Sequence, residues 1–238
     1  MFELIINGLI FMVELDEKRM EWFPQGEKKY NELIVQRAIE GLKKHHFKIK
    51  FFPKKEEAVE WLMSKIPAGS TVGVGGSYTL IQTGIIQKLA NRTDITFYNR
   101  WKLGIDGKEE RKTRYDNLSA DIFITGSNAL TLDGKLVNVD GMGNRIAAMI
   151  FGPKRVFFVV GKNKIVKDVN AAIQRIHNLT APKNAARYSL DLPCTQTGLC
   201  AWEDCNEPQR ICNFTLIIER PFNTRRMNII LIGEDLGF

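Results

Sequence analysis

The chain has 238 residues, of which 44% are hydrophobic and 26% are charged, and its net charge is +7. These values are those of an ordinary globular protein, so they exclude wholesale disorder and a fibrous repeat. The length suits one large domain, or one domain with a small appendage, better than two equal domains.

The positive net charge favours anionic partners in general. The basic residues are spread over residues 43–55, 100–114 and 154–167, and the middle stretch also carries acidic residues. That distribution is typical of solvated helix faces, and no nucleic-acid-binding motif is present. We therefore expect a small anionic metabolite as partner and no nucleic acid, and a homo-oligomer is compatible with the sequence.

The N-terminal apolar run, residues 4–13, is interrupted by Asn7 and Gly8 and is too short to span a bilayer. It also lacks the basic leader and cleavage site of a secretory signal. We expect a cytoplasmic protein without a membrane anchor, with residues 1–26 as an extension of one α/β domain, 27–238. Met12 opens an alternative start, so residues 1–11 are either a mis-assigned extension or a strand added to a sheet edge.

The rest of the chain alternates between helical and strand periodicity. Helices are predicted over residues 27–46, 56–66, 79–90, 108–118, 143–150 and 168–178. Strands are predicted over 47–52, 71–74, 95–98, 121–125 and 155–160, and 130–139 is a hairpin around Asp133-Gly134. Two last runs, 214–219 and 227–233, are expected to complete the sheet.

Strands that alternate with helices indicate a largely parallel, Rossmann-like sheet with helices on both faces. Ligands of such sheets bind beyond the carboxyl ends of the strands. Two glycine-rich turns follow predicted strands and are therefore the first candidates for a ligand site.

The first turn, TVGVGGS, contains Gly73, Gly75, Gly76 and Ser77. Glycines allow positive φ and close approach of a ligand to the backbone, and a following helix favours an anion. The turn lacks the full GxGxxG fingerprint and a Walker lysine, so a tight turn without a ligand is the alternative.

The second turn, VNVDGMGNR, brings polar side chains together with glycines. Its candidate residues are Asp140, Gly141, Gly143, Asn144 and Arg145. Arg145 is suited to hold a carboxylate or phosphate with two hydrogen bonds. Asp140 suits either a general acid or base or the cap of the helix that follows.

Lys162 and Lys164 follow the strand over 155–160, at the same edge of the predicted sheet. There they would add positive charge around an anion. Solvent exposure alone is the alternative for either lysine.

Cys194, Cys200, Cys205 and Cys212 are all the cysteines of the chain, and they lie in its least regular segment, 190–213. A reducing cytoplasm disfavours disulfides, so clustered thiols indicate zinc or an iron–sulfur centre. The spacing C-x5-C-x4-C-x6-C matches neither CxxC zinc pairs nor the usual ferredoxin runs, so reduced structural cysteines are the alternative, with a redox disulfide third.

Four segments together resemble the LUD family, the lactate-utilization proteins of the LutC/YkgG type. They are ADIFITGSNALTLDGKLVNVDGMGNRIAA, GPKRVFFVVGKNKIV, AAIQRIHNLTAPKNAAR and PCTQTGLCAWEDCNEPQRICN. The resemblance implies a fold of the NagB/RpiA/CoA-transferase-like superfamily, with the Gly73 turn as its phosphate loop. It also implies a role in oxidising lactate to pyruvate alongside iron–sulfur partner subunits.

One departure concerns the sugar-phosphate isomerases of that superfamily, which carry a catalytic aspartate near the start of the segment that is GSNALTLDGKLVNVDGMGNR here. Asn128 stands at that place. An amide cannot transfer the proton, so Asp140 would have to substitute.

The sequence thus predicts a component of L-lactate or 2-hydroxy-acid oxidation, with an anion held at the two turns. Asn128 and Asn144 would orient the ligand, and the cysteine segment would hold an iron–sulfur cluster or contact a subunit that does. One alternative is an independent enzyme that acts on a phosphorylated or CoA-linked metabolite. The other is a non-catalytic scaffold for iron–sulfur subunits.

Overall fold

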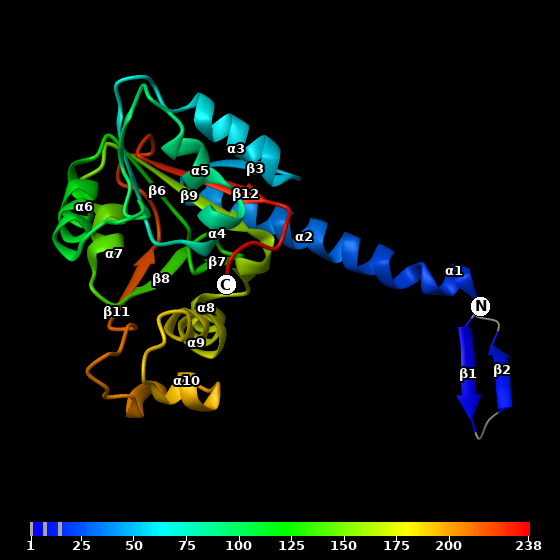
Figure 1. Ribbon diagram of the computed structural model, residues 1–238. Helices are drawn as coiled ribbons and strands as arrows, with labels where there is room; N and C mark the ends of the chain where they lie inside the picture. The colour runs from blue at the N-terminus through cyan, green and yellow to red at the C-terminus, as the bar shows by residue number, and fades with distance from the viewer. Residues whose placement is uncertain (1, 7–8, 14–15) are drawn as a thin grey trace.

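The structure is a computed structural model that describes residues 2–6, 9–13 and 16–238. At the N-terminus β1 (Phe2–Ile6) and β2 (Leu9–Val13) form an antiparallel pair. After α1 (Glu17–Met20), helix α2 (Trp22–Lys44) projects from the domain and carries this hairpin at its far end (Figure 1). Within the described residues the hairpin strands pair with each other and not with the edge of the domain's sheet, which was one of the two alternatives for this segment. The alternative start concerns Met1, which lies outside the described residues.

Six parallel strands form the main sheet. Across the sheet they are β3 (Lys48–Phe52), β12 (Met227–Ile232), β9 (Arg155–Gly161), β6 (Ile122–Thr125), β4 (Thr71–Val74) and β5 (Thr96–Tyr98). The parallel α/β sheet predicted from the sequence is therefore confirmed.

Side chains of these strands alternate between two hydrophobic cores, one on each face of the sheet. Ile124 and Val159 belong to the core on one face, whereas Phe123 and Phe158 belong to the core on the other. Successive strand residues point to opposite faces, so both faces of these strands are apolar and covered.

The first core is covered by α3 (Lys55–Ser64), α4 (Tyr78–Gln82) and α5 (Ile85–Ala90), and α2 and α7 (Asn144–Ile150) supply residues to the second. Helix α6 (Gly107–Ser119) connects β5 to β6. The single helix predicted over residues 79–90 is wrong in one respect, because it is two helices that separate at Gly84. This glycine has a φ of 72°, which a continuing α-helix does not allow.

A second, four-stranded sheet has the order β10 (Ile165–Val166), β7 (Ala129–Thr131), β8 (Leu136–Asp140) and β11 (Phe214–Ile218). The predicted hairpin of β7 and β8 around Asp133-Gly134 is confirmed. The expectation that both C-terminal runs complete the main sheet is half wrong. Only β12 joins it, whereas β11 pairs antiparallel with β8.

Two glycines allow α2 to touch the turn of this hairpin. A Cβ atom on Gly134 would collide with the backbone of Gly41, and Gly134 also has a φ of 90°. A Cβ atom on Gly41 would lie 2.8 Å from the backbone nitrogen of Gly134. The second sheet is therefore fixed to α2 by backbone contact.

The chain between β10 and β11 forms a helical lobe, coloured yellow to orange in Figure 1. It contains α8 (Val169–Arg175), a π-helical turn (Ile176–Thr180), α9 (Ala181–Ala186), α10 (Pro193–Thr197) and a 3-10 turn (Trp202–Asp204). The helix predicted to end near residue 178 thus continues, through the π turn, into α9. Cys194 lies in α10, and the rest of the cysteine segment consists of turns and extended chain.

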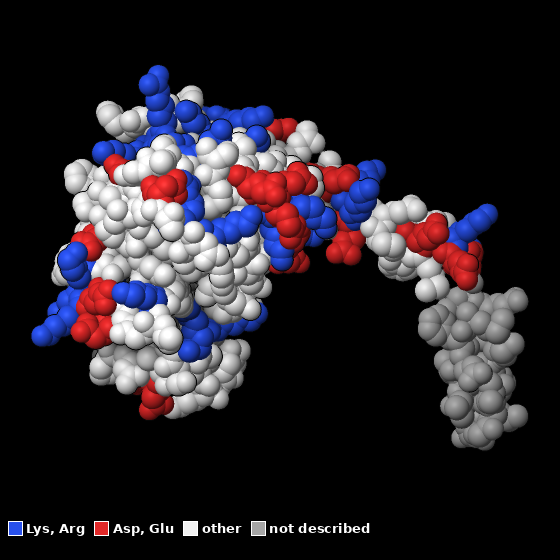
Figure 2. Space-filling view, turned by 45° about the horizontal axis from the view of Figure 1, so that its top comes forward, with Lys and Arg blue, Asp and Glu red and all other residues white. Residues whose placement is uncertain are grey.

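The surface of the projecting helix α2 is charged. Figure 2 shows acidic and basic side chains next to one another along it. Within the part of the chain that the structure describes, no helix combines the length and the apolarity needed to cross a membrane.

The strand order places a crevice at the carboxyl ends of β4 and β6. The chain leaves β4 for β5 on one side and then returns through α6 to β6 on the other. Connections that diverge in this way open a ligand crevice between neighbouring parallel strands. The first glycine turn follows β4, and the segment that begins at Gly126 follows β6.

Candidate functional site

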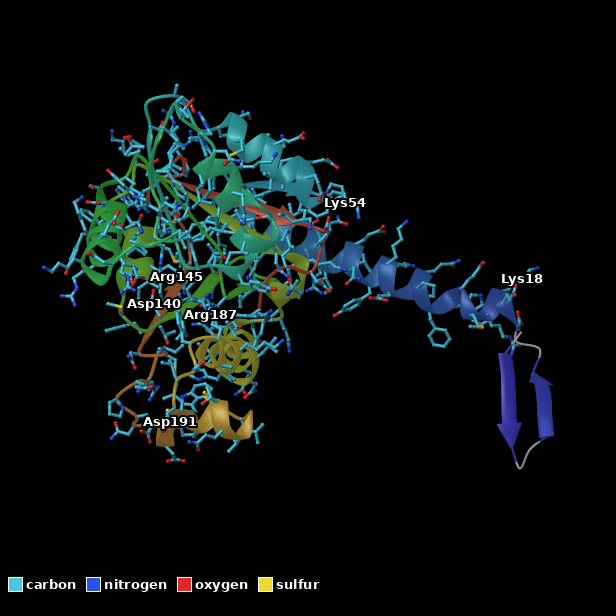
Figure 3. The ribbon with its side chains drawn as sticks, in the orientation of Figure 1. Lys18, Lys54, Asp140, Arg145, Arg187 and Asp191 are labelled. Carbon is cyan, nitrogen blue, oxygen red and sulfur yellow. The ribbon has the colours of Figure 1, made fainter. Side chains whose placement is uncertain are left out.

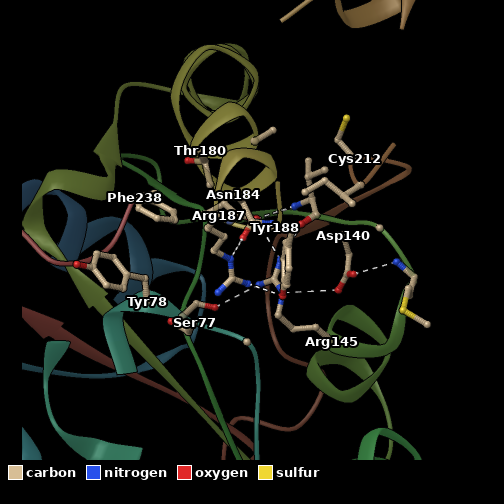
Figure 4. A pocket seen from close by; sticks show the side chains of 18 of the residues that line it. Ser77, Tyr78, Asp140, Arg145, Thr180, Asn184, Arg187, Tyr188, Cys212 and Phe238 are labelled. Atoms are coloured by element: carbon tan, nitrogen blue, oxygen red, sulfur yellow. Dashed lines mark hydrogen bonds and ion pairs between the residues drawn. The ribbon is translucent and has the colours of Figure 1, made fainter. Parts of the chain in front are cut away.

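A cavity of about 450 Å³ opens at this crevice and extends to the helical lobe (Figure 4). Its walls come from the turn after β4, the segments after β6 and β8, helices α6 and α9, and the cysteine segment. Asp140, Arg145 and Arg187 lie together where the sheet meets the lobe, whereas Lys18 and Lys54 lie away from it (Figure 3).

The glycines of the first turn have different surroundings. A Cβ atom on Gly73 would collide with the Asn117 side chain, and one on Gly75 would lie 2.5 Å from the hydroxyl of Thr125. Both glycines therefore serve close packing under the turn, and neither lines the cavity. Gly76 and Ser77 do line it.

Two arginines flank Gly76. A Cβ atom on Gly76 would lie 3.1 Å from Nη1 of Arg100 and 3.9 Å from Nη2 of Arg187. Glycine at this position keeps the space between the guanidinium groups open. The first turn thus lies next to two basic side chains, Arg100 from the segment between β5 and α6 and Arg187 from the end of α9.

The second turn is organised by the carboxylate of Asp140. Its Oδ1 accepts hydrogen bonds from the backbone N–H groups of Met142 (3.2 Å) and Gly143 (3.4 Å), and Oδ2 accepts one from Ile146 (3.3 Å). These contacts cap the start of α7, which was one of the two predicted roles. Asp140 also lines the cavity, so its role in acid–base chemistry stays a prediction.

Arg145 extends along the cavity floor with its guanidinium bound to the protein. Nη1 donates to Oδ1 of Asn138 (3.0 Å), and Nη2 donates to Oδ1 of Asn128 (3.1 Å) and to the carbonyl of Val139 (2.8 Å). Nε lies 3.6 Å from Oδ2 of Asp140. Burial lowers the pKa of Arg145, and Asp140 opposes this effect. The predicted two-bond contact between Arg145 and a ligand stays a prediction.

The two asparagines join the segments after β6 and within β8. Asn128 donates its backbone N–H to Oδ1 of Asn138 (3.2 Å), and its own Oδ1 also accepts from the N–H of Val139 (2.8 Å). The amide of the buried Asn138 donates to the hydroxyl of Ser127 (3.1 Å). Together with Arg145 they form one hydrogen-bonded network that fixes the shape of this wall.

Positive charge exceeds negative charge around the cavity. Among the described residues five basic side chains line it, namely Arg100, Arg114, Arg145, Lys164 and Arg187, against two acidic side chains, Glu110 and Asp140. Such a surplus in a concave site concentrates anions.

Arg100 and Arg114 share one carboxylate. Their Nη2 atoms lie 2.8 and 2.7 Å from Oε1 of Glu110. Arg114, and to a lesser degree Arg100, lower the pKa of Glu110. Nε of Arg114 is buried and has no hydrogen-bond partner among the described residues.

Arg187 is held by neutral groups. Its Nε donates to Oδ1 of Asn184 and its Nη2 to the hydroxyl of Tyr188, both at 2.7 Å. Within the described chain no carboxylate forms an ion pair with it, so its charge is the least neutralised among the cavity arginines.

Lys164 differs sharply from Lys162. The side chain of Lys164 is 4% exposed and lines the cavity, and its Nζ donates to the hydroxyl of Thr79 (2.8 Å). Burial, with the charges of Arg175 and Arg145 as lesser causes, lowers the pKa of Lys164 to about 7. Lys162 lies outside the cavity lining, with its Nζ 3.8 Å from Asp235.

Of the other residues predicted for the second turn, Gly141 and Asn144 line the cavity and Gly143 does not. Gly143 has a φ of 83° and forms the N-cap of α7, so its role is conformational. Aromatic rings close one end of the cavity, where Tyr78 stacks on Phe238 with ring centroids 5.0 Å apart.

The cysteine segment meets the cavity at Cys212. Burial, followed by the nearby thiols of Cys200 and Cys205, raises the pKa of Cys194, so the four sulfurs occupy one region. Within the part of the chain described, no three His, Cys, Asp or Glu side chains are placed as ligands of a single metal ion. A tetrahedral zinc ion would need sulfurs about 3.8 Å apart, whereas a cluster of several irons holds its thiolates farther apart.

Hydrogen-bond donors surround these sulfurs. The Cys200 sulfur accepts from the backbone N–H of Trp202 (3.3 Å) and lies 3.4 Å from Nδ1 of His177. Arg210 donates from Nη1 to the carbonyl of Cys205 (2.7 Å), and its Nε is buried without a partner among the described residues. Burial raises the pKa of Cys212, and the charge of Arg210 opposes this effect. Four thiols close to a guanidinium with one unpartnered nitrogen fit an anionic iron–sulfur cluster in donor type and charge.

Several residues of this site gave no signal in the sequence. Arg100, Arg114 and Arg187 are isolated arginines that only the fold brings together, and His177 reaches Cys200 through the π turn. Asn138 could have been identified, because it is the polar residue within a buried strand of the hairpin.

Comparisons with known proteins give the following matches. The LUD domain matches residues 35–232, and a search of curated proteins finds no match. A crystal structure of a DUF162 family protein from Deinococcus radiodurans is 11% identical, with a TM-score of 0.49, and the match covers 85% of this chain and 98% of that chain. For eIF2B delta from Chaetomium thermophilum the identity is 14%, the TM-score is 0.35, and the coverage is 69% and 64%. Since the LUD domain match spans most of the chain, this protein belongs to the LUD domain family.

Proposed function

We propose that this protein serves lactate or 2-hydroxy-acid utilization by binding a small carboxylate in the cavity between the sheet and the helical lobe. Membership of the LUD family suggests the pathway. The surplus of basic side chains over carboxylates in the cavity wall is the observation that supports an anionic ligand.

In this proposal the ligand carboxylate binds near Gly76, between Arg100 and Arg187. The space there is open because Gly76 has no side chain, and Arg187 has no acidic partner among the described residues. Arg145 contributes less directly, since its donors already bind protein oxygens. It acts as a positioning residue that holds Asn128 and the β8 segment in the cavity wall.

The contribution of Arg187 can be measured with Arg187→Gln. Loss of a charge-assisted hydrogen bond of about 1.5 to 3 kcal/mol should weaken binding of L-lactate or pyruvate by roughly ten- to a hundredfold. Isothermal titration calorimetry on the full chain measures this.

The matched control is Arg111→Gln, which removes the same charge from an exposed position of α6 outside the cavity lining. Its affinity should equal that of the wild type. Equal affinities for all three proteins, or equal losses in both variants, would place the carboxylate elsewhere.

A second candidate is an independent enzyme for a phosphorylated or CoA-linked metabolite. The volume of the cavity, about 450 Å³, supports this second candidate, because pockets of this size accommodate ligands much larger than lactate. Thermal shift with sugar phosphates, CoA thioesters, lactate and pyruvate separates the two, since a ligand that binds the folded state stabilises it by an amount that grows with the ratio of ligand concentration to Kd. Stabilisation by the larger ligands alone would favour the second candidate. The scaffold alternative predicts no response to any of them and a tight complex with iron–sulfur subunits.

We further propose that Cys194, Cys200, Cys205 and Cys212 hold an iron–sulfur cluster, which when bound would supply one-electron transfer near the cavity. His177, Arg210 and the N–H of Trp202 would donate hydrogen bonds to the thiolates. The support is the gathering of four thiols next to a buried, unpartnered guanidinium nitrogen.

Anaerobically purified protein provides the test. We expect a brown protein with iron and acid-labile sulfide, and Cys205→Ser should lose both. Serine at Cys205 is the informative choice because this is the most buried residue of the four. Colourless protein with stoichiometric zinc would make the segment structural, and metal-free protein would leave four reduced thiols.

A further inference from the structure

Lys164 is a buried amine in the wall of the cavity. It ends the turn after β9, and its Nζ reaches the hydroxyl of Thr79 at 2.8 Å. Within the described residues it forms no ion pair with a carboxylate, and the charged groups that act on it are the guanidinium groups of Arg175 and Arg145. Its location thus combines low hydration, neighbouring positive charge and access to a ligand.

The neighbours of Lys164 are fixed in place. Arg175 donates from Nη1 to the main-chain oxygens of Asn128 (2.9 Å) and Phe238 (3.1 Å). Arg145 is held by the network described above. A Cβ atom on Gly237 would lie 2.9 Å from Nζ, so the chain before Phe238 closes the other side. The amine therefore has a defined position rather than the freedom of a surface lysine.

Burying a lysine lowers the stability of a fold, because its charged amine must leave water. Methionine would fill similar space without that cost. Desolvation next to other cations is, however, the environment that turns a lysine into a neutral nucleophile towards carbonyl groups. The low pKa of Lys164, about 7, agrees with this reactivity.

We propose that Lys164 forms a Schiff base with the ketone carbon of a 2-oxo acid bound in the cavity. This inference rests on the proposed function, because the carboxylate of the 2-oxo acid would bind the basic side chains of the same cavity. It adds a covalent step and a substrate class in which a carbonyl group stands next to the carboxylate.

The step is balanced without an oxidant or reductant. The lone pair of Nζ attacks C2, a C–N bond forms, and one proton passes from the nitrogen to the carbonyl oxygen, which becomes a hydroxyl group. That hydroxyl takes up one proton from solvent and leaves as water, and the nitrogen, which keeps one hydrogen, becomes an iminium ion. Thr79 is a positioning residue in this step, since its hydroxyl accepts one N–H of the amine.

Borohydride trapping with pyruvate tests the proposal on the full chain. Sodium borohydride reduces an iminium ion to a stable secondary amine, which peptide mass spectrometry locates. We expect one reduced pyruvyl group per chain, on Lys164. L-lactate, which has no ketone, should give no adduct in the same experiment.

Variants sharpen the assignment. Lys164→Arg and Lys164→Met should abolish the adduct, whereas Lys167→Arg, at an exposed lysine three residues away, should retain it. Because the wild-type adduct is located directly, the test does not depend on how the two Lys164 variants fold.

Calorimetry with pyruvate on the same sample separates this proposal from the proposed function. If pyruvate binds and no adduct forms on Lys164, the Schiff base is overturned and the anion site stands. If adducts spread over exposed lysines such as Lys167 without preference for Lys164, the Schiff base is likewise overturned. If pyruvate neither binds nor reacts, both proposals fail for this ligand class.

Discussion

The guanidinium of Arg145 donates to protein oxygens along the cavity floor. Its partners come from β8 and from the segment after β6, so one side chain joins two walls. An arginine whose guanidinium already donates to protein oxygens holds the cavity wall in place, and it has few donors left to bind a ligand. Arg187, whose partners among the described residues are neutral, is the better candidate for direct contact with an anion.

At the same scale, Lys164 should make stability depend on pH. Its pKa is about 7 in the folded protein and 10.5 when hydrated, so between these values the unfolded chain binds more protons than the folded one. Stability of the wild type therefore rises with pH across this window, and the cost of burying the charge is fully present below about pH 7. Lys164→Met should be more stable than the wild type at neutral pH, by about 1 to 4 kcal/mol, and this difference should shrink towards pH 10.

Urea unfolding followed by circular dichroism at several pH values measures the difference. Lys167→Met is the control, because an exposed lysine should give a difference near zero at every pH. A constant gap between Lys164→Met and the wild type across the window would show that Lys164 keeps its charge on folding.

The sequence could predict those site residues that lie close together along the chain. Asp140 and Arg145 belong to one turn whose polar density exceeds what a connection needs, and both line the cavity. Arg100 and Arg187 lie far apart in the sequence, each on a segment without a motif. Only the sheet order and the π turn after α8 place them on either side of Gly76.

At the scale of elements, the hairpin of β7 and β8 depends on its contact with α2. Gly134→Ala would introduce both a strained backbone at positive φ and a collision with Gly41. We expect it to lower the free energy of unfolding by about 2 to 4 kcal/mol. Thermal or urea unfolding measures this loss.

Gly26→Ala is the matched control. Gly26 lies in α2, the helix that contains Gly41, and a Cβ atom there would have no neighbour within 4 Å. Alanine favours the helix over glycine, so stability should stay unchanged or rise by up to about 1 kcal/mol. Similar losses in both variants would mean that the contact between Gly134 and Gly41 is not what lowers stability.

Elements with a strong local pattern were predicted well. The strands β4, β6 and β9 are short apolar runs, and Asp133-Gly134 is a turn signal between alternating residues. The break at Gly84 was missed because apolar residues continue on both sides of it at helical spacing. The pairing of β11 with β8 could not be predicted, since its alternation suits either sheet and only the tertiary structure decides.

For the whole molecule, strand and helix alternation was enough to predict a parallel sheet covered on both faces. It could not predict the strand order or the second sheet, because both depend on contacts between distant parts of the chain. The LUD domain match covers the sheet and the helical lobe, and the projecting part of α2 begins before it.

The strand order also constrains when the protein can fold during its synthesis. β12 lies between β3 and β9, and among the strands that the structure describes β3 pairs in the main sheet with β12 alone. The first strand of that sheet to leave the ribosome must therefore wait for the last, with its apolar residues uncovered in the meantime. Such non-local pairing slows folding and prolongs exposure to aggregation, so a nascent chain of this protein gains most from a chaperone just before β12 emerges.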